Sequence, residues 1–509
     1  MGSTESFQAV VVGGGPAGST MAWALARQGV NVALIERTEY PREKVCGDFV
    51  EPAGLRVLGA MGCLETLERQ SQLPITHVAG FVSCEQVYQG EIPYMHDKYN
   101  LPPHGYIIPR ETLDMEMFNC AAAAGAKVYT GANVTGVVRE GHTTTVNVRL
   151  KDKSTFSLKA PMVVGADGVT SVVKRSYIGK LPRHEWYTSS SQRAYVEGVD
   201  LAEGEATMWF DEACYPGYGW IFPMHGGRAN VGIGILKEAA IRHNVNVPDM
   251  FTGFIERLKR HHPACENIRI EREPIGGRVD SYAAIDCNVF DGAILVGDAG
   301  CFVDPMTYEG ITPGMESAII GSRTVMDALE TGHFDPQFLS QFESDYREHF
   351  DPSMRFLDFG SAAVKNRHLR DFFLSVIKQG WQQAAEDPDF ARTSGTVLGG
   401  LDLRPWPVTQ QMWQKIGRYF VEGGKTTIRE FMRGRSGYDT PFGRDMRKWQ
   451  SGTRVSMLAD LPWHMNWLKD VAVKLARVDF TSHNPRLQGA LHYLDSTNLR
   501  ADQEEASHG

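Results

Sequence analysis

The chain has 509 residues, which is enough for two or three domains of ordinary size. Hydrophobic residues make up 42% and charged residues 22%, which is typical of a globular protein and argues against a fibrous or disordered one. The formal net charge of -9 gives no overall electrostatic reason to bind the polyanionic backbone of nucleic acid. We therefore expect a soluble protein that has no nucleic-acid partner.

Cysteine usage and the N-terminus favour a cytoplasmic setting. The eight cysteines are scattered, with no CxxC pair and no spacing that is typical of a zinc site. The first residues, MGSTESFQAVVV, contain no basic region, and glycines interrupt the apolar run, so neither a signal peptide nor a membrane-spanning helix is predicted. We expect reduced thiols and no metal site.

The first predicted unit is a strand, a helix and a second strand. Residues 8–12 are an apolar run typical of a buried strand, residues 16–28 carry small and apolar residues suited to a helix, and residues 30–35 form the next strand. Because such a crossover joins parallel strands, this unit predicts an α/β fold built on a parallel sheet.

The turn inside this unit carries the spacing GxGxxG. Gly13 permits the tight turn, Gly15 lets the backbone approach a pyrophosphate, and Gly18 lets the helix pack closely on the strand. The helix N-terminus faces the phosphate charge, and Glu36 would accept hydrogen bonds from ribose hydroxyls. The turn predicts nucleotide binding but leaves both FAD and NAD open.

Later segments predict how the rest of the chain is organised. Residues 126–130, 162–164 and 292–296 are predicted to return to the parallel sheet, whereas residues 192–199 and 206–210 alternate as antiparallel strands do. From about residue 340 the pattern is helical and rich in tryptophan. We predict a discontinuous Rossmann-like domain over residues 1–75, 109–185 and 276–340, a β-rich substrate domain over 76–108 and 186–275, and a helical region over 341–509.

Two further motifs distinguish FAD from NAD, because they resemble motifs of a known family. MVVGADGVTSVVKR, at 162–175, and VGDAGCFVDPMTYEGITPGMESA, at 296–318, resemble the DG and GD motifs of the two-domain flavoprotein hydroxylases. The resemblance implies FAD, with Asp298 on the ribityl hydroxyls and the next helix N-terminus facing the flavin ring, where N–H groups stabilise negative charge. Lys174, Gly300 and Cys301 depart from the usual motifs, so the electron donor, NAD(P)H or another, stays open.

A narrower resemblance lies at PREKVCGDFVEP, residues 41–52, and YPGYGWIFPMHGGRANVGIG, residues 215–234. These segments are similar to the geranylgeranyl reductase branch, which implies that Tyr218, Trp220 and Phe222 line a cavity for long isoprenoid chains. Alternate residues of a strand share one face, and the alternative is that the three are simply core. The resemblance also implies that Cys46 lies beside the flavin, and the alternative is an inert buried thiol.

Two arginines are expected near the cofactor, although both could instead be surface charges. Arg37 follows Glu36 and would contact the adenosine half, and Arg110 in GYIIPRETLD matches an arginine of the hydroxylases. Cys46, Tyr218, Trp220 and Phe222 are the predicted catalytic residues. The predicted cofactor-binding residues are Gly13, Gly15, Pro16, Ala17, Gly18, Glu36, Arg37, Cys46, Gly47, Arg110, Asp167, Gly168, Gly297, Asp298, Pro305, Gly310 and Ile311.

The predicted function is that of an FAD-dependent oxidoreductase, either a reductase or a monooxygenase. Its substrate would be a hydrophobic polyene, polyprenyl or polyketide-like small molecule of secondary metabolism. A cyclase or isomerase with structural FAD is the alternative, and a halogenase is disfavoured because the strand reads YGWIFP and residues 71–90 contain no lysine. The stretch 415–448 has nine basic and four acidic residues, for which a solvated helical face is favoured over contact with a membrane surface.

Overall fold

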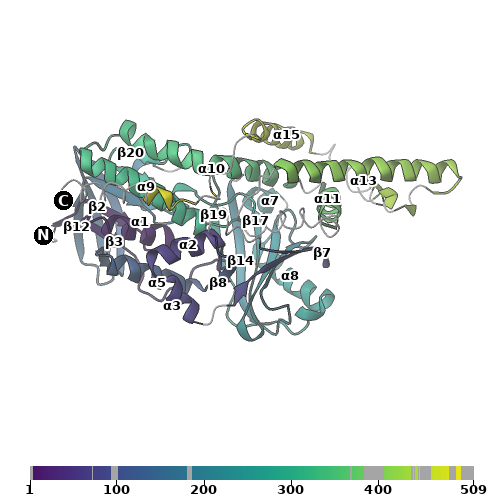
Figure 1. The fold of residues 1–509 in the computed structure, drawn as a ribbon, viewed down its shortest axis with the longest axis horizontal. Helices are drawn as coiled ribbons and strands as arrows, with labels where there is room; N and C mark the ends of the chain where they lie inside the picture. Colours follow the sequence, from purple (N-terminus) through teal and green to yellow (C-terminus); the bar gives the residue numbers. More distant parts are fainter. Residues whose placement is uncertain are drawn as a thin grey trace, which may run out of the picture.

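A computed structural model describes residues 4–70, 73–92, 101–179, 186–242, 244–366, 369–382, 406–436, 439–440, 442–444, 446–447, 460–480, 486 and 489–494. Two parts built on sheets lie side by side, and a long helix, α10, runs along both of them (Figure 1). One part carries the glycine turn, and the other carries the aromatic strand. The site is built where they meet.

The first part is a sheet in the order β20-β21-β13-β2-β3-β9, in which every pairing except that of β20 is parallel. β2 lies between β13 and β3, as the strand–helix–strand unit predicts. The strands are β2 (Ala9–Val12), β3 (Val32–Ile35), β9 (Lys127–Tyr129), β13 (Met162–Gly165), β20 (Val289–Phe290) and β21 (Ala293–Leu295). The predicted α/β class is confirmed.

Both faces of this sheet are covered. Ala9 and Val11 pack against helices α1 (Pro16–Ala26) and α9 (Ile311–Thr331), whereas Val10 and Val12 face a second sheet. Helix α5 (Arg110–Ala123) packs on α1. The covering sheet consists of β1 (Thr4–Ser6), β10 (Ala132–Glu140), β11 (Thr143–Leu150) and β12 (Thr155–Ala160). Burial on both sides explains why β2 is apolar throughout rather than alternating.

The second part is an eight-stranded sheet whose main path is β18-β14-β17-β16-β15-β6-β7, with β19 paired to β14. Its strands are β6 (His77–Val82), β7 (Glu85–Glu91), β14 (Thr188–Glu197), β15 (Glu205–Phe210), β16 (Tyr218–Met224), β17 (Arg228–Leu236), β18 (Arg269–Ile270) and β19 (Ile275–Asp280). Helix α8 (Val247–His261) covers one face, on which Ile221 lies. The opposite face of β16 is free to line a site.

One strand pairing differs from the sequence prediction. Residues 206–210 were expected in antiparallel pairing, and β15 does pair so with β16, but its other neighbour, β6, is parallel. Alternation of apolar residues reports which face of a strand is buried, not the direction of the strand beside it. The parallel pairing brings a segment from more than 100 residues earlier into the second sheet.

Short elements link the two parts. A small sheet of β4 (Phe49–Val50), β8 (Gly105–Ile107) and β5 (Pro74–Ile75) follows the segment that contains Cys46. The remaining helices of this region are α2 (Pro52–Met61), α3 (Leu64–Arg69), α6 (Val172–Ile178) and α7 (Lys237–Arg242). Helix α2 begins directly after β4, so the chain passes from the cavity wall into the helical layer.

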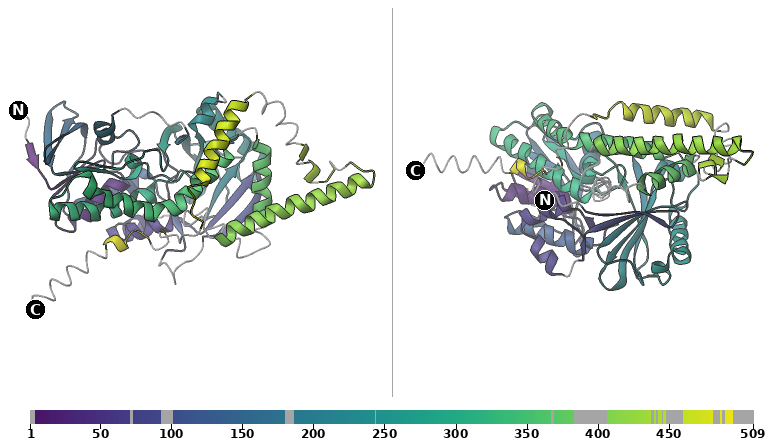
Figure 2. Two further views of the ribbon diagram at one scale, coloured as in Figure 1. Left: turned by 90° about the horizontal axis from the view of Figure 1, so that it is seen from above. Right: turned by 45° about the vertical axis from the view of Figure 1, so that its right-hand side comes forward.

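The C-terminal region is helical, as predicted, with α10 (Pro336–Val364), α11 (Arg370–Gln382), α13 (Trp406–Met432) and α15 (Leu461–Leu475). The buried Lys474 of α15 lies 2.5 Å from Asp358 of α10, which ties the two helices together. Helix α13 extends away from the body (Figures 1 and 2), and its described basic side chains are exposed. Part of the basic stretch 415–448 lies outside the described residues. Among the residues described, no helix is long and apolar enough to cross a membrane.

Candidate active site

A cavity of about 510 Å³ lies between the two parts, which is within the usual size range of ligand pockets. Its walls come from the glycine turn, the segment 44–51, the start of α9 and the inner face of the second sheet. The predicted residues that line it are Gly15, Pro16, Ala17, Arg37, Cys46, Gly47, Arg110, Gly168, Tyr218, Trp220, Phe222, Gly297, Asp298, Gly310 and Ile311. Most of the predicted site is therefore gathered around one space.

The three glycines of the turn have distinct environments. A Cβ atom on Gly13 would lie 2.3 Å from the carbonyl oxygen of Ala166, and one on Gly18 would lie 1.8 Å from the carbonyl oxygen of Gly13. Both positions are closed by backbone, so only glycine fits. Gly15 instead borders the cavity, with only the tip of Arg42 near, at 3.4 Å. Its open backbone at the N-terminus of α1 fits the pyrophosphate of FAD.

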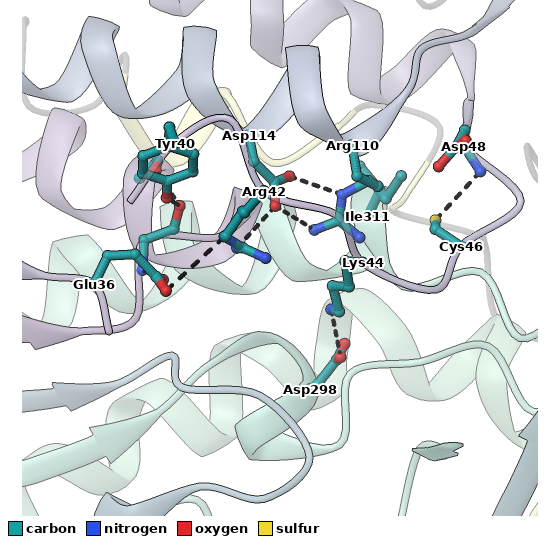
Figure 3. Close-up of polar contacts among 12 residues, drawn as sticks. Glu36, Tyr40, Arg42, Lys44, Cys46, Asp48, Arg110, Asp114, Asp298 and Ile311 are labelled. Atoms are coloured by element: carbon teal, nitrogen blue, oxygen red, sulfur yellow. Dashed lines mark hydrogen bonds and ion pairs between the residues drawn. The ribbon is translucent and has the colours of Figure 1, made fainter. Parts of the chain in front are cut away.

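Asp298 lies on the opposite wall, in the short helical turn that follows β21. Its carboxylate accepts a hydrogen bond of 3.1 Å from Nζ of Lys44 (Figure 3). Burial raises the pKa of the Asp298 carboxyl, but the charge and hydrogen bond of Lys44, together with the charges of Arg110 and Lys174, hold the pKa below its ordinary value. A charged acceptor on the wall fits a ligand that offers hydroxyl groups, as the ribityl chain of FAD does.

Replacing Asp298 with alanine should weaken FAD binding by about 1.5 to 3 kcal/mol, the usual worth of a hydrogen bond to a charged group. The loss should be seen as a higher Kd when the apoprotein is titrated with FAD. Asp291→Ala is the control, because Asp291 makes an exposed ion pair with Arg139 away from the cavity. Equal FAD affinity in wild type and Asp298→Ala would contradict the assignment.

The segment that carries Cys46 is held by a buried polar network. Asp48, with a left-handed backbone at φ +64°, donates its N–H to Sγ of Cys46 at 3.3 Å. Its carboxylate accepts hydrogen bonds from the Tyr195 hydroxyl at 2.6 Å and the Asn230 amide at 2.8 Å. Asn230 also donates to the carbonyl oxygen of Cys46 at 2.9 Å. Strands β14 and β17 thus fix the position of the thiol.

Burial sets the ionisation of this segment. It raises the pKa of Asp48 to about 6, against the opposing effect of the Tyr195 hydrogen bond. Burial likewise raises the pKa of the Cys46 thiol, although the charge of Arg110 acts in the other direction. Because a raised pKa keeps the proton on sulfur at neutral pH, Cys46 is a neutral thiol on the cavity wall rather than a thiolate nucleophile.

The aromatic strand presents one continuous surface. The ring centroids of Tyr218 and Trp220 lie 6.0 Å apart, and those of Trp220 and Phe222 lie 6.2 Å apart. Tyr308, from the loop before α9, stacks on Tyr218 at 6.0 Å. Tyr218 and Trp220 are only 8% and 6% exposed. The wall and core alternatives are therefore not exclusive, because the same rings are buried and line the cavity.

Arg110 is held by ion pairs beneath the cavity. Its guanidinium contacts both oxygens of Asp114, at 2.7 and 2.9 Å, and Asp114 also lies 2.8 Å from Arg42 (Figure 3). Arg110 is 3% exposed and borders the cavity near Cys46. The alternative of a surface charge is wrong for Arg110, because Arg110 is buried in an ion pair with Asp114.

Five predicted cofactor residues do not border the cavity: Gly13, Gly18, Glu36, Asp167 and Pro305. Glu36 accepts hydrogen bonds from the N–H groups of Gly14 and Thr38, and so supports the glycine turn. Asp167 accepts hydrogen bonds from the N–H groups of Val172 and Val173 and so caps helix α6. Direct contact of these residues with FAD stays a prediction.

Sequence reasoning did not single out several residues that border the cavity, namely Lys44, Asp48, Glu51, Tyr308 and Glu309. Lys44 and Asp48 lie in the same motif as Cys46, and this could have marked them as site residues. Glu51 lies in the same motif and Glu309 lies in the GD motif, so the same signal was available for them, although an acid before a helix usually caps that helix.

Comparison with known proteins agrees with this geometry. A family model described as "FAD binding domain" matches residues 6–228, and one described as "Geranylgeranyl reductase catalytic domain" matches residues 188–272. Digeranylgeranylglycerophospholipid reductase 2 of Methanothermobacter thermautotrophicus is 30% identical over 351 residues, 67% of this chain and 83% of the relative. The chain belongs to the geranylgeranyl reductase family. It is an FAD-dependent oxidoreductase.

Another curated relative and a solved structure are similar as well. The menaquinone reductase of Mycolicibacterium smegmatis is 27% identical over 320 residues, 60% of this chain and 73% of that protein. A geranylgeranyl bacteriochlorophyll reductase-like structure from Thermoplasma acidophilum has a TM-score of 0.65 at 22% identity and covers 81% of this chain and 100% of its own. The structural likeness supports the fold.

Proposed function

We propose that this protein uses FAD to reduce carbon–carbon double bonds in a polyprenyl chain. The observation that carries the proposal is a single cavity bordered both by the glycine turn with Asp298 and by the aromatic strand. The names of the curated relatives, which are reductases of digeranylgeranylglycerophospholipid and of menaquinone, support a substrate with an isoprenoid part. A place in secondary metabolism stays a prediction.

The aromatic wall suits an apolar chain because its polar groups are already satisfied inside the protein. The Tyr218 hydroxyl donates to the carbonyl oxygen of Thr307, and Nε1 of Trp220 donates to the Asn230 side chain at 3.0 Å. Phe222 has no polar group. The rings can therefore contact a polyprenyl chain and exclude water from it without presenting an unpaired donor.

Each part of the site has a role in this reaction. The glycine turn and Asp298 would hold FAD, and the start of α9 at Ile311 borders the same cavity, with the N–H groups of Ile311 and Thr312 donating to Glu309. When bound, the reduced cofactor supplies the hydride. Tyr218, Trp220 and Phe222 hold the chain against the cofactor and keep water out, which favours one orientation of the double bond.

A Cys46→Ala variant should keep FAD and its melting temperature but turn over more slowly, if the thiol contacts the substrate or the flavin. Stability should change by less than about 1 kcal/mol, because one weak sulfur hydrogen bond is lost. The measurement is steady-state turnover beside FAD content. Cys287→Ala, away from the cavity, is the control. Wild-type turnover in Cys46→Ala would favour the inert buried thiol.

Product mass tests the proposed function. The protein, loaded with FAD and reduced chemically, is incubated with a polyprenyl lipid or with menaquinone. A gain of two hydrogen atoms in the polyprenyl chain, measured after any quinol has been reoxidised in air, supports the reductase, whereas a gain of one oxygen atom in air indicates a monooxygenase. A changed structure at unchanged mass indicates a cyclase or isomerase, in which FAD is structural.

A further inference from the structure

Two carboxyl groups border the cavity without a role in holding FAD. Glu51 stands before α2 and is 3% exposed, yet its side chain makes no capping hydrogen bond and its Oε2 atom is buried without a partner. Glu309 stands before α9, and its Oε2 atom is also buried without a partner. Both residues line the cavity. A buried, unpartnered carboxyl oxygen is costly and calls for an explanation.

The two carboxyls differ in the hydrogen bonds that they receive. Oε1 of Glu309 accepts from the N–H groups of Ile311 and Thr312, both at 2.9 Å, and the helix N-terminus favours a negative charge there. Among the described residues, Glu51 receives no such bond. Of two neighbouring buried carboxyls, the proton stays on the one with fewer donors, so Glu51 is the protonated partner.

Burial raises the pKa of both carboxyls, and it raises that of Glu309 to about 8 even though Glu309 accepts backbone hydrogen bonds. Burial and then the charge of Glu309 raise the pKa of Glu51 well above its ordinary value, and Asp304 and Glu316 add to the effect. The charge of Arg486 lowers the pKa of Glu51. The guanidinium of Arg486 already forms an ion pair with Glu316 at 3.1 Å, and His349 lies 3.4 Å from the same Glu316 carboxylate. The positive charge of Arg486 that acts on Glu51 is thus shared with Glu316.

We propose that Glu51 donates the proton that completes the reduction, and that Glu309 is a positioning residue that keeps this proton on Glu51; the proposal rests on the proposed function. Reducing a double bond needs a hydride and a proton. The hydride from reduced flavin forms one C–H bond with its own electron pair. The O–H bond of Glu51 breaks, its proton forms the second C–H bond, and the carboxylate left behind takes a proton from water.

The first test needs neither substrate nor turnover. Infrared spectra of the protein at neutral pH should contain the carbonyl stretch of a protonated carboxyl group, and its intensity should fall in Glu51→Gln. Glu65→Gln, on the exposed face of α3, is the matched control and should leave the band unchanged. In Glu309→Gln the band that remains should titrate at lower pH, because a negative neighbour is gone. An undiminished band in Glu51→Gln overturns the proposal.

The second test measures product formation by the FAD-loaded enzyme with a polyprenyl substrate. Glu51→Gln should bind FAD normally but form product about 10²–10⁴ times more slowly, the usual contribution of general acid catalysis. Wild-type activity should fall as pH rises through the pKa of Glu51, and Glu309→Gln should move this fall to lower pH. Glu51→Asp should keep the infrared band and recover part of the rate. If Glu51→Gln turns over as fast as wild type, Glu51 is not the proton donor. If wild type forms no product although its infrared band is present, only the proposed function is rejected.

Discussion

Replacing Trp220 with alanine is expected to lower the free energy of unfolding by about 3 to 5 kcal/mol, as for other large aromatic side chains removed from a core. The ring lies against Gly232, where an added Cβ would come within 2.1 Å of it. Its Nε1 atom also satisfies Asn230, the residue that holds the Cys46 carbonyl and Asp48. The substitution therefore leaves a cavity and loosens the segment beside the predicted flavin site.

The same substitution should weaken binding of a polyprenyl substrate by about 2 kcal/mol, from the apolar area lost on the wall. Thermal melting and substrate titration, carried out on one preparation, separate the two effects. Trp220→Phe is the matched variant, because it keeps most of the apolar area and loses only the hydrogen bond. Full affinity with a large loss of melting temperature would assign Trp220 to the core alone.

Asp114→Asn is expected to lower the free energy of unfolding by about 3 to 5 kcal/mol, the usual cost of breaking a buried ion pair by removing one partner. Asp114 is fully buried and neutralises both Arg42 and Arg110. An asparagine keeps the shape but removes the counter-charge of the buried Arg110, and it leaves the partly buried Arg42 with Glu36 at 3.9 Å. Because Arg110 borders the cavity, FAD affinity should fall as well.

Chemical denaturation and FAD titration of Asp114→Asn measure these losses. The control is Glu65→Gln, which breaks the exposed ion pair with Arg69 one helical turn away and should cost less than about 1 kcal/mol. Both variants remove one carboxylate that pairs with arginine, so burial is the main difference between them. Similar small effects in the two would show that the charges around Asp114 are solvated.

Local sequence was sufficient for the features that local geometry dictates. The glycine turn was predictable because Gly18 packs on the carbonyl oxygen of Gly13, in the same turn, at a distance that excludes any side chain. The shared face of Tyr218, Trp220 and Phe222 followed from the two-residue period of a strand. The GD motif implied a helix after Asp298, and α9 begins at Ile311. In each case the controlling contacts lie within one element or its immediate neighbours.

Only the tertiary structure decided which distant side chains meet. Lys44 and Asp298 are 254 positions apart and form an ion pair, and Arg486 returns from the C-terminal region to pair with Glu316. Glu51 and Glu309 stand in two of the quoted motifs, but only the structure shows that both border one cavity. Periodicity reports which face of an element is buried, whereas charge pairing and proton affinity depend on what packs against that face. For this protein, the sequence by itself therefore determined the cofactor fold, and the packing of distant segments determined the charges around the cavity.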